Sequence, residues 1–376
     1  MKPRKYFPLG KAYGEAFCNR VDETRWLVGN LKNIKHSLLI APRRYGKSSL
    51  AEKAIEKANM PFIKINFHLC TTEEEVAQII VNNVIKLIGK SIGHFEKMIT
   101  SIKKYVSNLS PKISFGEDIA TLELVPKKHI NQSLIISEVL LLIEKLLLEQ
   151  NKKAVIFFDE FQEIGKISQT GNIEGAIRTA AQEMQNVSII FSGSVRSLLI
   201  QMFNDEQRPL YKLCRKLKLE RIGSEDYKKH INKIALETWN KPLEETAFSD
   251  IMNYSCRHPY YVNYLCDVIW ESEKYPNCED IKKAWSIVVQ EEWSDALKEI
   301  SILSLAQRKI LKHIATHDIK TITDQETSSN TQLPVSTISS VVNVLLEKDY
   351  IEIDEAGYYR VINPVLATVL KNLDEH

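Results

Sequence analysis

Residues 41–50 read APRRYGKSSL and contain a Gly-Lys-Ser triplet of the kind that ends a phosphate-binding loop. In such a loop Gly46 lets the backbone approach the phosphates, Lys47 supplies a positive charge, and Ser48 offers a hydroxyl to Mg²⁺. The full motif begins with glycine where this chain has Ala41. A methyl group there is a small change unless that residue needs a positive φ. We therefore expect residues 42–49 to bind a nucleotide: Pro42, Arg43, Arg44, Tyr45, Gly46, Lys47, Ser48 and Ser49.

Two acidic residues, Asp159 and Glu160, follow the apolar run AVIFF. In an ATP site an acid at the end of a strand holds Mg²⁺, and a second acid orients or polarises the attacking water. We assign these roles to Asp159 and Glu160. Two acids that merely cap a buried strand are a common alternative. The loop and the acid pair together favour a site for ATP and Mg²⁺.

The run IIFSGS offers two hydroxyls, Ser192 and Ser194, at the end of another apolar segment. Either could hydrogen-bond the γ-phosphate or the water, and a simple turn of small residues is the alternative. Arg196 and Arg208 are candidates to stabilise charge, within the chain or from a neighbouring subunit. A solvated arginine is the alternative for each.

These residues need a scaffold, and the chain between residues 37 and 222 alternates short apolar runs with helical periodicity. The runs are SLLIA (37–41), FIKINF (62–67), AVIFFD (154–159), VSIIFSG (187–193) and RKLKLERI (215–222). Thr72 and Glu75 have the spacing of a capping box before one helical segment. The pattern predicts an α/β fold, a parallel sheet with helices on both faces.

The rest of the chain has other patterns of apolar and polar residues. Alternating residues around 116–118 predict a hairpin in an inserted segment, about 91–132. Residues 224–298 read as all helical, and from 305 two helices precede a hairpin that turns at 355–357, a winged helix-turn-helix pattern. We expect three domains: a core over 1–223, a helical lid over 224–299 and a winged helix over 300–376.

Composition narrows the class of protein. The chain has 376 residues, 44% apolar and 26% charged, with a net charge of +2, which is typical of a soluble globular protein. The apolar stretch 134–149 is interrupted by charges and too short to span a membrane. We expect a cytoplasmic protein with no membrane association, and the six cysteines, which have no C-x-x-C spacing, to be free thiols.

Four segments in order, APRRYGKSSL, VIFFDEFQEI, IEGAIRTAAQEMQNVSIIFSGS and RHPYYVNYLCDVIW, resemble the prokaryotic AAA-type ATPases of the STAND and archaeal-ATPase group. The resemblance covers nearly the whole chain. It implies a P-loop ATPase domain, a helical lid and a C-terminal winged helix, a layout related to that of origin-recognition initiators.

The resemblance also implies further site residues. AFCNRVDET looks like the element that lies against adenine, which points to Asn19 and Arg20. Ser192 and Ser194 match the sensor strand, and the RHPYY turn of the lid points to Pro259. Many relatives have P-L-Y-G-R after the sensor strand. This chain has RPLYKLCRK, with no arginine at that position. The role of an arginine finger, which stabilises charge on the phosphates, would then fall to Arg208 or Arg215.

Two classes of function follow. One is an ATP-hydrolysing switch that moves a winged helix onto or off double-stranded DNA or a protein partner. The other is a regulator, locked by ATP or ADP, that hydrolyses slowly or not at all; self-association fits both. A small-molecule kinase fits the loop but not the acid pair or the winged helix. The segment 300–376 carries 7 Lys and Arg against 10 Asp and Glu, so it should bind DNA only weakly by itself.

Overall fold

The computed structural model describes residues 6–92, 109–115, 120–126, 131–168 and 171–373. Contacts divide the chain into two compact units. The first comprises Arg20–Ala41 and Lys47–Leu219, and we call it the sheet unit. The second comprises Met1–Asn19, Pro42–Gly46 and Glu220–His376, and we call it the C-terminal unit. Each is described by itself.

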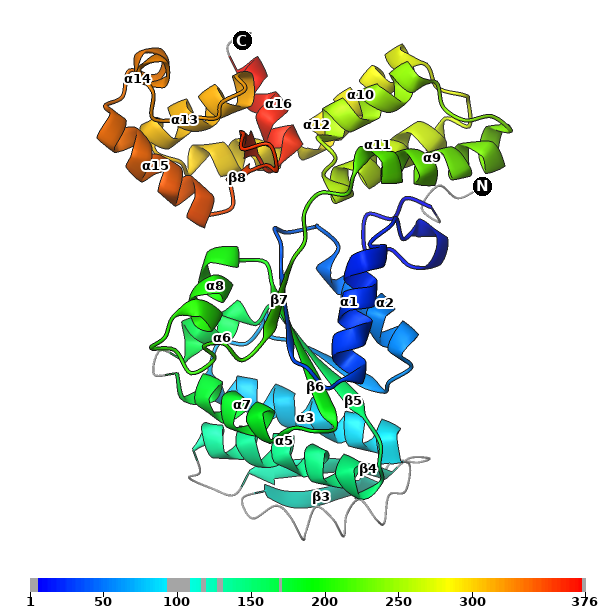
Figure 1. Ribbon diagram of the computed structural model, residues 1–376, viewed down its shortest axis with the longest axis vertical. Coiled ribbons are helices and arrows are strands. Elements are labelled where there is room, and N and C mark those ends of the chain that lie inside the picture. The colour runs from blue at the N-terminus through cyan, green and yellow to red at the C-terminus, as the bar shows by residue number, and fades with distance from the viewer. Residues whose placement is uncertain (1–5, 93–108, 116–119, 127–130, 169–170, 374–376) are drawn as a thin grey trace. The chain divides into compact units, whose positions relative to one another are not determined.

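The sheet unit is built on five parallel strands in the order β2-β5-β6-β1-β7 (Figure 1). Their bounds are β1 Ser37–Ile40, β2 Phe62–Asn66, β5 Ala154–Asp159, β6 Val187–Gly193 and β7 Arg215–Lys218. All five apolar runs identified in the sequence are therefore strands. Strands β5, β6 and β1 are parallel neighbours, so their carboxyl ends lie together at one end of the sheet.

Helices cover both faces of this sheet. They are α1 (Val21–Lys32), α2 (Lys47–Ala58), α3 (Glu73–Ile92), α5 (Gln132–Glu149), α6 (Gln162–Ile167), α7 (Asn172–Glu183) and α8 (Arg196–Asn204). Leu38, Ile156 and Phe191 join one core with buried residues of α3, α5, α7 and α8. Because side chains alternate along a strand, buried neighbours such as Leu39 face the other side, where α1 and α2 lie together. The predicted α/β architecture is confirmed.

Local hydrogen bonds explain where two of these helices begin. The Asn131 side chain accepts from the backbone N–H of Ser133 at the start of α5. At α3 the Thr72 hydroxyl accepts from Glu75 N–H, which is half of the predicted capping box. The Glu75 carboxylate instead accepts from the Thr71 N–H and hydroxyl.

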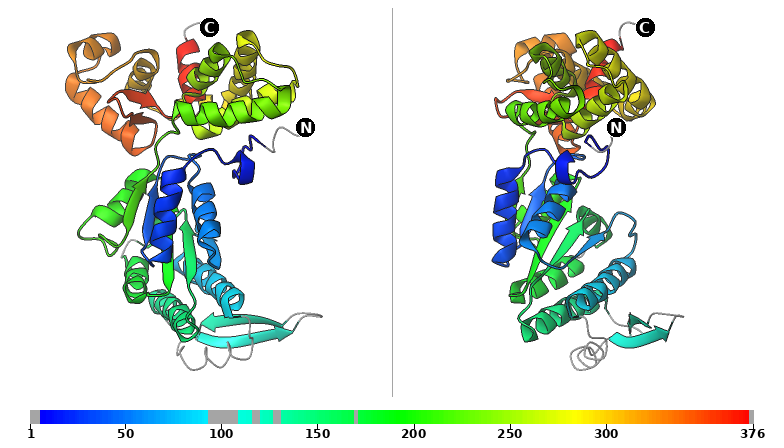
Figure 2. Two further views of the ribbon diagram at one scale, coloured as in Figure 1. Left: turned by 45° about the vertical axis from the view of Figure 1, so that its right-hand side comes forward. Right: turned by 90° about the vertical axis from the view of Figure 1, so that its right-hand side faces the viewer.

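The inserted segment contains the predicted hairpin. Strands β3 (Leu109–Phe115) and β4 (Ala120–Pro126) pair antiparallel, separate from the main sheet. Figure 2 shows the pair beside α3. The predicted turn at 116–118 lies outside the described residues.

The C-terminal unit is mainly helical. After a 3-10 turn at Gly14–Ala16 it contains α9 (Ser224–Trp239), α10 (Glu245–Ser255), α11 (Pro259–Glu271) and α12 (Cys278–Ser301). The chain's N-terminal segment packs here: the Tyr6 hydroxyl donates to Glu237 at 3.0 Å, and Phe7 contacts Trp270. The sequence placed residues 1–19 with the core domain, whereas they group with this unit.

The end of the chain has the predicted helices and hairpin. Its elements are α13 (Leu305–Thr316), α14 (Gln325–Thr331), α15 (Val335–Glu347), β8 (Ile351–Ile353), β9 (Tyr359–Val361) and α16 (Pro364–Asn372). Gly357 has φ +85° in the hairpin turn, a conformation that favours glycine. We call residues 305–372 the helix–hairpin module.

Two expectations about the whole chain can be compared with the structure. All six cysteines are free thiols, as predicted. Within the described residues, none of the helices combines the length and apolar character needed to cross a bilayer.

Candidate nucleotide site

The segment between β1 and α2 has the layout expected of a phosphate-binding loop. β1 ends at Ile40 and α2 begins at Lys47, so the unpaired N–H groups of the first helical turn face the loop. Gly46 has φ +83° and Arg44 has φ +63°, but Ala41 is not in the positive-φ region. Residue 41 therefore does not need to be glycine for conformational reasons. Ala41, the one departure from the motif, is compatible with a phosphate-binding loop.

Lys47 is the best-buried charge of the loop, with 7% of its surface exposed. Its Nζ donates to the carbonyl oxygen of Ala41 at 2.9 Å, across the loop that it closes. The ammonium thus lies at the positive end of the α2 dipole, where a phosphate would be attracted by both.

Asp159 lies at the end of β5 and connects two other predicted residues. The Ser48 hydroxyl donates to Asp159 Oδ2 at 3.1 Å, and the Ser192 hydroxyl donates to Oδ1 at 2.5 Å. Burial raises the pKa of Asp159, but hydrogen bonds from Lys64 and Ser192 outweigh it and lower the pKa overall. The group is therefore a carboxylate at neutral pH. Three segments distant in sequence meet at this one side chain.

Lys64 also belongs to this cluster and was missed in the sequence. Its Nζ lies 2.5 Å from Asp159 Oδ2 and 3.3 Å from Ser48 Oγ. The sequence shows only a lysine in the middle of FIKIN, and the pairing of its strand with the Asp159 strand is seen in the structure alone. The oxygens of Ser48 and Asp159 are the donors that Mg²⁺ prefers, so they fit that ion. Lys64 competes for the same two oxygens.

Glu160 is held by Ser194, which follows β6, and by a residue that the sequence did not reveal. Its Oε2 accepts from the Ser194 hydroxyl at 2.7 Å and from Gln162 Nε2 at 2.7 Å. Gln162 is fully buried. A Cβ on Gly193 would lie 1.8 Å from Gln162 Oε1, so the glycine of FSGS leaves the space that Gln162 fills.

The candidate arginines lie elsewhere in the sheet unit. Arg208 pairs through two nitrogens with the fully buried carboxylate of Glu174 in α7. This pairing explains its conformation without a nucleotide, so a finger role for Arg208 stays a prediction. Arg196 is the first residue of α8, and Arg215 begins the edge strand β7.

The predicted adenine contacts are divided between the two units. Asn19 (φ +49°) belongs to the C-terminal unit, whereas Arg20 (φ +61°) caps α1 of the sheet unit and pairs with Glu23 at 2.8 Å. Pro259 is the first residue of α11, after the buried N-cap His258. Their common role in binding adenine stays a prediction.

Residues 42–46 have partners of their own within the C-terminal unit. Tyr45 is 2% exposed, and its hydroxyl donates to Glu352 of β8 at 3.1 Å. Arg221 donates to the same carboxylate at 2.7 Å. The Arg44 guanidinium lies 3.3 Å from Glu292 of α12 and stacks over Tyr260 of α11. Hence Arg44 and Tyr45, at positions that the loop motif leaves unspecified, bond to acidic residues in α12 and in the β8–β9 hairpin.

Comparison with known proteins supports the fold. No family model matches the chain, and no curated protein matches it. Among solved structures, the Walker-type ATPase of Pyrococcus abyssi is similar with a TM-score of 0.67 and 21% identity, over 98% of this chain and 99% of that one. The ORC2 protein of Aeropyrum pernix, solved in ADPNP and ADP complexes, is similar with a TM-score of 0.56 and 11% identity, over 99% and 98%. The chain therefore has the fold of a P-loop ATPase over nearly its whole length.

Proposed function

We propose that the protein binds ATP with Mg²⁺ and hydrolyses it to ADP and phosphate. The observation that carries the proposal is the cluster at the carboxyl edge of the sheet, in which Ser48, Asp159 and Ser192 share hydrogen bonds. Lys47 and the loop amides would hold the phosphates, and Ser48 and Asp159 would hold Mg²⁺, which supplies charge neutralisation on the phosphates.

Hydrolysis needs one proton acceptor beside the γ-phosphate. The oxygen of water forms a bond to the γ-phosphorus while the bond from that phosphorus to the bridging oxygen of ADP breaks. Glu160 takes the proton from the water, and Ser194 orients the carboxylate through its 2.7 Å hydrogen bond. Ser192, bonded to Asp159, keeps that carboxylate aligned.

We further propose that nucleotide turnover is transmitted to the helix–hairpin module, which would act as a winged helix on double-stranded DNA or a protein partner. Support comes from Tyr45 of the phosphate loop, which bonds to Glu352 in the module. Arg44 of the same loop bonds to Glu292 of α12, a helix that packs against α16 of the module. A change in the loop on loss of the γ-phosphate would alter these bonds. Breaking the bond of a buried tyrosine is costly, so the coupling would be substantial.

A second candidate function is a nucleotide-locked regulator with slow turnover. It is favoured by one observation: Glu160 Oε2 already accepts from the Ser194 hydroxyl, from Ser194 N–H at 3.3 Å and from Gln162. With three donors on this one oxygen, a hydrogen bond would have to break before Oε2 could take a proton from water.

The deciding experiment measures ATP hydrolysis by the wild type and Glu160→Gln, with and without duplex DNA, at low and high salt. A control is Glu163→Gln: Glu163 pairs with Lys166 and also accepts a hydrogen bond from Gln162 at 3.2 Å, so this variant separates loss of the Glu160 carboxylate from a disturbance of Gln162. Turnover that Glu160→Gln loses and Glu163→Gln keeps supports the ATPase. Stimulation by DNA that weakens in high salt supports the switch. Tight nucleotide retention without turnover under every condition supports the regulator.

A further inference from the structure

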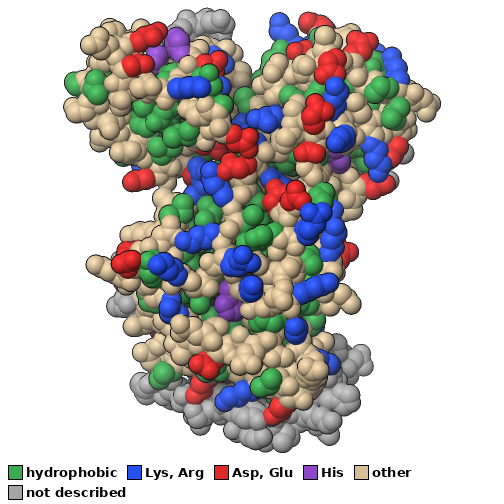
Figure 3. Space-filling view, viewed as in Figure 1, with side chains coloured by type: hydrophobic (Ala, Val, Ile, Leu, Met, Phe, Trp, Pro, Cys, Tyr) green, Lys and Arg blue, Asp and Glu red, His purple; other side chains and the backbone are tan. Residues whose placement is uncertain are grey.

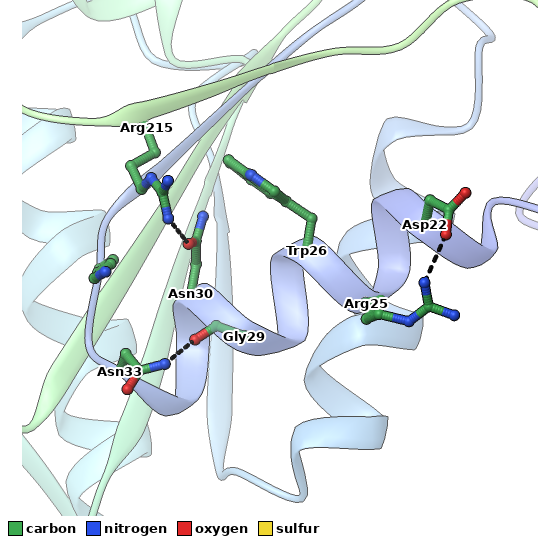
Figure 4. Close-up of a pocket in the computed structure, with 8 residues that line it drawn as sticks. Asp22, Arg25, Trp26, Gly29, Asn30, Asn33 and Arg215 are labelled. Atoms are coloured by element: carbon green, nitrogen blue, oxygen red, sulfur yellow. Dashed lines mark hydrogen bonds and ion pairs between the residues drawn. The ribbon is translucent and has the colours of Figure 1, made fainter.

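An open pocket of about 400 Å³ lies on the sheet unit, lined by α1, the turn that follows it and the first residue of β7. Its lining residues are Asp22, Arg25, Trp26, Gly29, Asn30, Asn33, Lys35 and Arg215 (Figure 4). Lys35 and Arg215 lie at the amino ends of β1 and β7, whereas the nucleotide site lies at the carboxyl ends. The pocket is thus a separate feature from the site described above.

Backbone hydrogen bonds fix the shape of this pocket. After α1 the chain turns back, with Ile34 at φ +49° and Lys35 N–H donating to the Asn30 carbonyl at 2.9 Å. Arg215 N–H donates to the His36 carbonyl at 3.0 Å, which holds β7 beside that turn. The Arg215 guanidinium donates to Asn30 Oδ1 at 3.2 Å, and Figure 4 shows the two side chains pointing toward one another.

The charge of the pocket is mostly positive and only partly compensated. Arg25 pairs with Asp22 at 2.8 Å, and both side chains are largely exposed. Lys35 and Arg215 form no ion pair with a carboxylate in the described part of the chain. The exposed Lys32 lies in the last turn of α1. Lys216, the next residue of β7, points to the opposite face of the strand and bonds to Asn204. Figure 3 shows Lys and Arg side chains spread over this face of the sheet unit.

An aromatic ring lies among these cations. Trp26 projects from α1 toward β7 (Figure 4), is only partly buried, and lies 5.8 Å from the Arg215 guanidinium carbon. A flat ring beside cations in an open groove is the arrangement that binds unpaired bases and their phosphates. Such a base could stack on Trp26, while Lys35 and Arg215 contact the phosphates on either side.

We propose that this pocket binds a segment of single-stranded nucleic acid. The ligand is recognised by stacking on Trp26 and by phosphate contacts to Lys35 and Arg215. A duplex fits less well because its bases are already paired and stacked. Lysines on an edge strand also prevent strands of other molecules from pairing with it, but that role requires neither Trp26 nor a pocket. The proposal does not depend on ATP hydrolysis or on the helix–hairpin module.

The test is fluorescence anisotropy with a labelled single-stranded oligonucleotide of about 20 nucleotides, long enough to cover the pocket. The full chain is used without ATP. Trp26→Ala should weaken binding by about tenfold, and Trp26→Phe should retain most of the affinity because it keeps a ring. Lys35→Gln and Arg215→Gln should each weaken binding several-fold and lower the slope of log affinity against log salt by about 0.7, measured between about 50 and 200 mM.

Control variants distinguish binding at this pocket from binding elsewhere on the chain. Lys348→Gln, at the end of α15, should leave oligonucleotide binding unchanged. Thermal melting of Trp26→Ala checks that the variant folds, and if it does not, Lys35→Gln and Arg215→Gln keep the test valid, because both residues are exposed. The proposal is overturned by absence of binding, by equal loss with Lys348→Gln, by equal affinity for the matched duplex, or by an unchanged affinity in Trp26→Ala. Competition by polyglutamate as strong as by unlabelled oligonucleotide would indicate an acidic protein partner and would also overturn it.

Discussion

Charged residues at the two ends of the same sheet differ in their burial and pairing. We call the end where the strands finish the carboxyl edge, and the end where they begin the amino edge. At the carboxyl edge, Asp159 is 5% exposed and accepts hydrogen bonds from Ser48, Ser192 and Lys64. At the amino edge, Lys35 and Arg215 are exposed and meet no carboxylate in the part of the chain that the structure describes. A buried charge is stable only when it is paired, whereas an exposed one needs no partner.

This difference has consequences for function. The carboxyl edge has groups held in fixed positions, as chemistry on a phosphate requires. The amino edge has cations whose partner must come from outside, as electrostatic binding requires. Variants at the first should therefore change stability and catalysis, and variants at the second should change salt-dependent binding and little else.

The largest effect is expected from Lys47→Ala. Removing the ammonium should weaken ATP binding by about 100-fold or more, because charge-assisted hydrogen bonds to phosphate are lost. Calorimetric titration with ATP measures the change. Oligonucleotide binding by the same variant should be unaltered. Unchanged ATP affinity would refute the nucleotide site, and parallel loss of both ligands would show that the two regions are not separate.

Gly193→Ala should have the next largest effect. The new methyl group would lie 1.8 Å from Gln162 Oε1, and such overpacking costs about 1–3 kcal/mol of the free energy of unfolding. Urea denaturation measures it. Gly175→Ala is the matched control, since its Cβ would have no neighbour within 4 Å and alanine favours the helix by about 0.5–1 kcal/mol. Equal stability of both variants would contradict the role of Gly193 in seating Gln162.

Sequence could predict much of the carboxyl edge because its residues lie in contiguous motifs. Each strand is a run of apolar residues, and its functional side chains follow directly, as Asp159 and Glu160 follow AVIFF. Parallel strands then bring those ends together. Lys64 and Gln162 were not predicted because their roles depend on strand order and on packing against Gly193, which no local pattern records.

The amino edge was less accessible to sequence reasoning. Trp26 and Asn30 are four residues apart on α1, but Arg215 lies 185 residues beyond Asn30 and becomes their neighbour only because β7 pairs with β1. The basic character of residues 1–60, 13 Lys and Arg against 5 Asp and Glu, was visible. The sequence did not show that this basic segment lies beside the exposed strand RKLK, because such a run is equally typical of a solvent-exposed edge strand.

Lys64→Met tests whether Lys64 competes with Mg²⁺ for Asp159 at the carboxyl edge. Without the ammonium 2.5 Å away, Asp159 has no competitor for Mg²⁺, so the magnesium concentration for half-maximal ATP binding should fall about three- to tenfold. Without magnesium the variant should be less stable, because the carboxylate loses a charged partner. Titration of ATP binding with MgCl₂, and urea denaturation with and without Mg-ATP, measure both. Lys53→Met on the neighbouring helix α2 is the control. A higher magnesium requirement in Lys64→Met would mean that Lys64 assists the ion.

The smallest effect concerns His36, a buried residue just before β1. Burial lowers its pKa, partly opposed by the bond to the Ala181 carbonyl, and its Nδ1 accepts from Ile189 N–H at 3.1 Å. The folded protein therefore keeps His36 neutral while the unfolded chain takes up a proton below a pH of about 6.5. Stability is unaffected above that pH and falls below it, by at most about 1.4 kcal/mol per pH unit.

Urea denaturation from about pH 7.5 to 5.5 should show a shallower loss of stability in His36→Gln than in the wild type. The control is His68→Gln, which replaces an exposed histidine and should lose stability as the wild type does. An identical loss in all three proteins would mean that His36 is protonated in the folded state, and its charge would then have to be added to the amino edge.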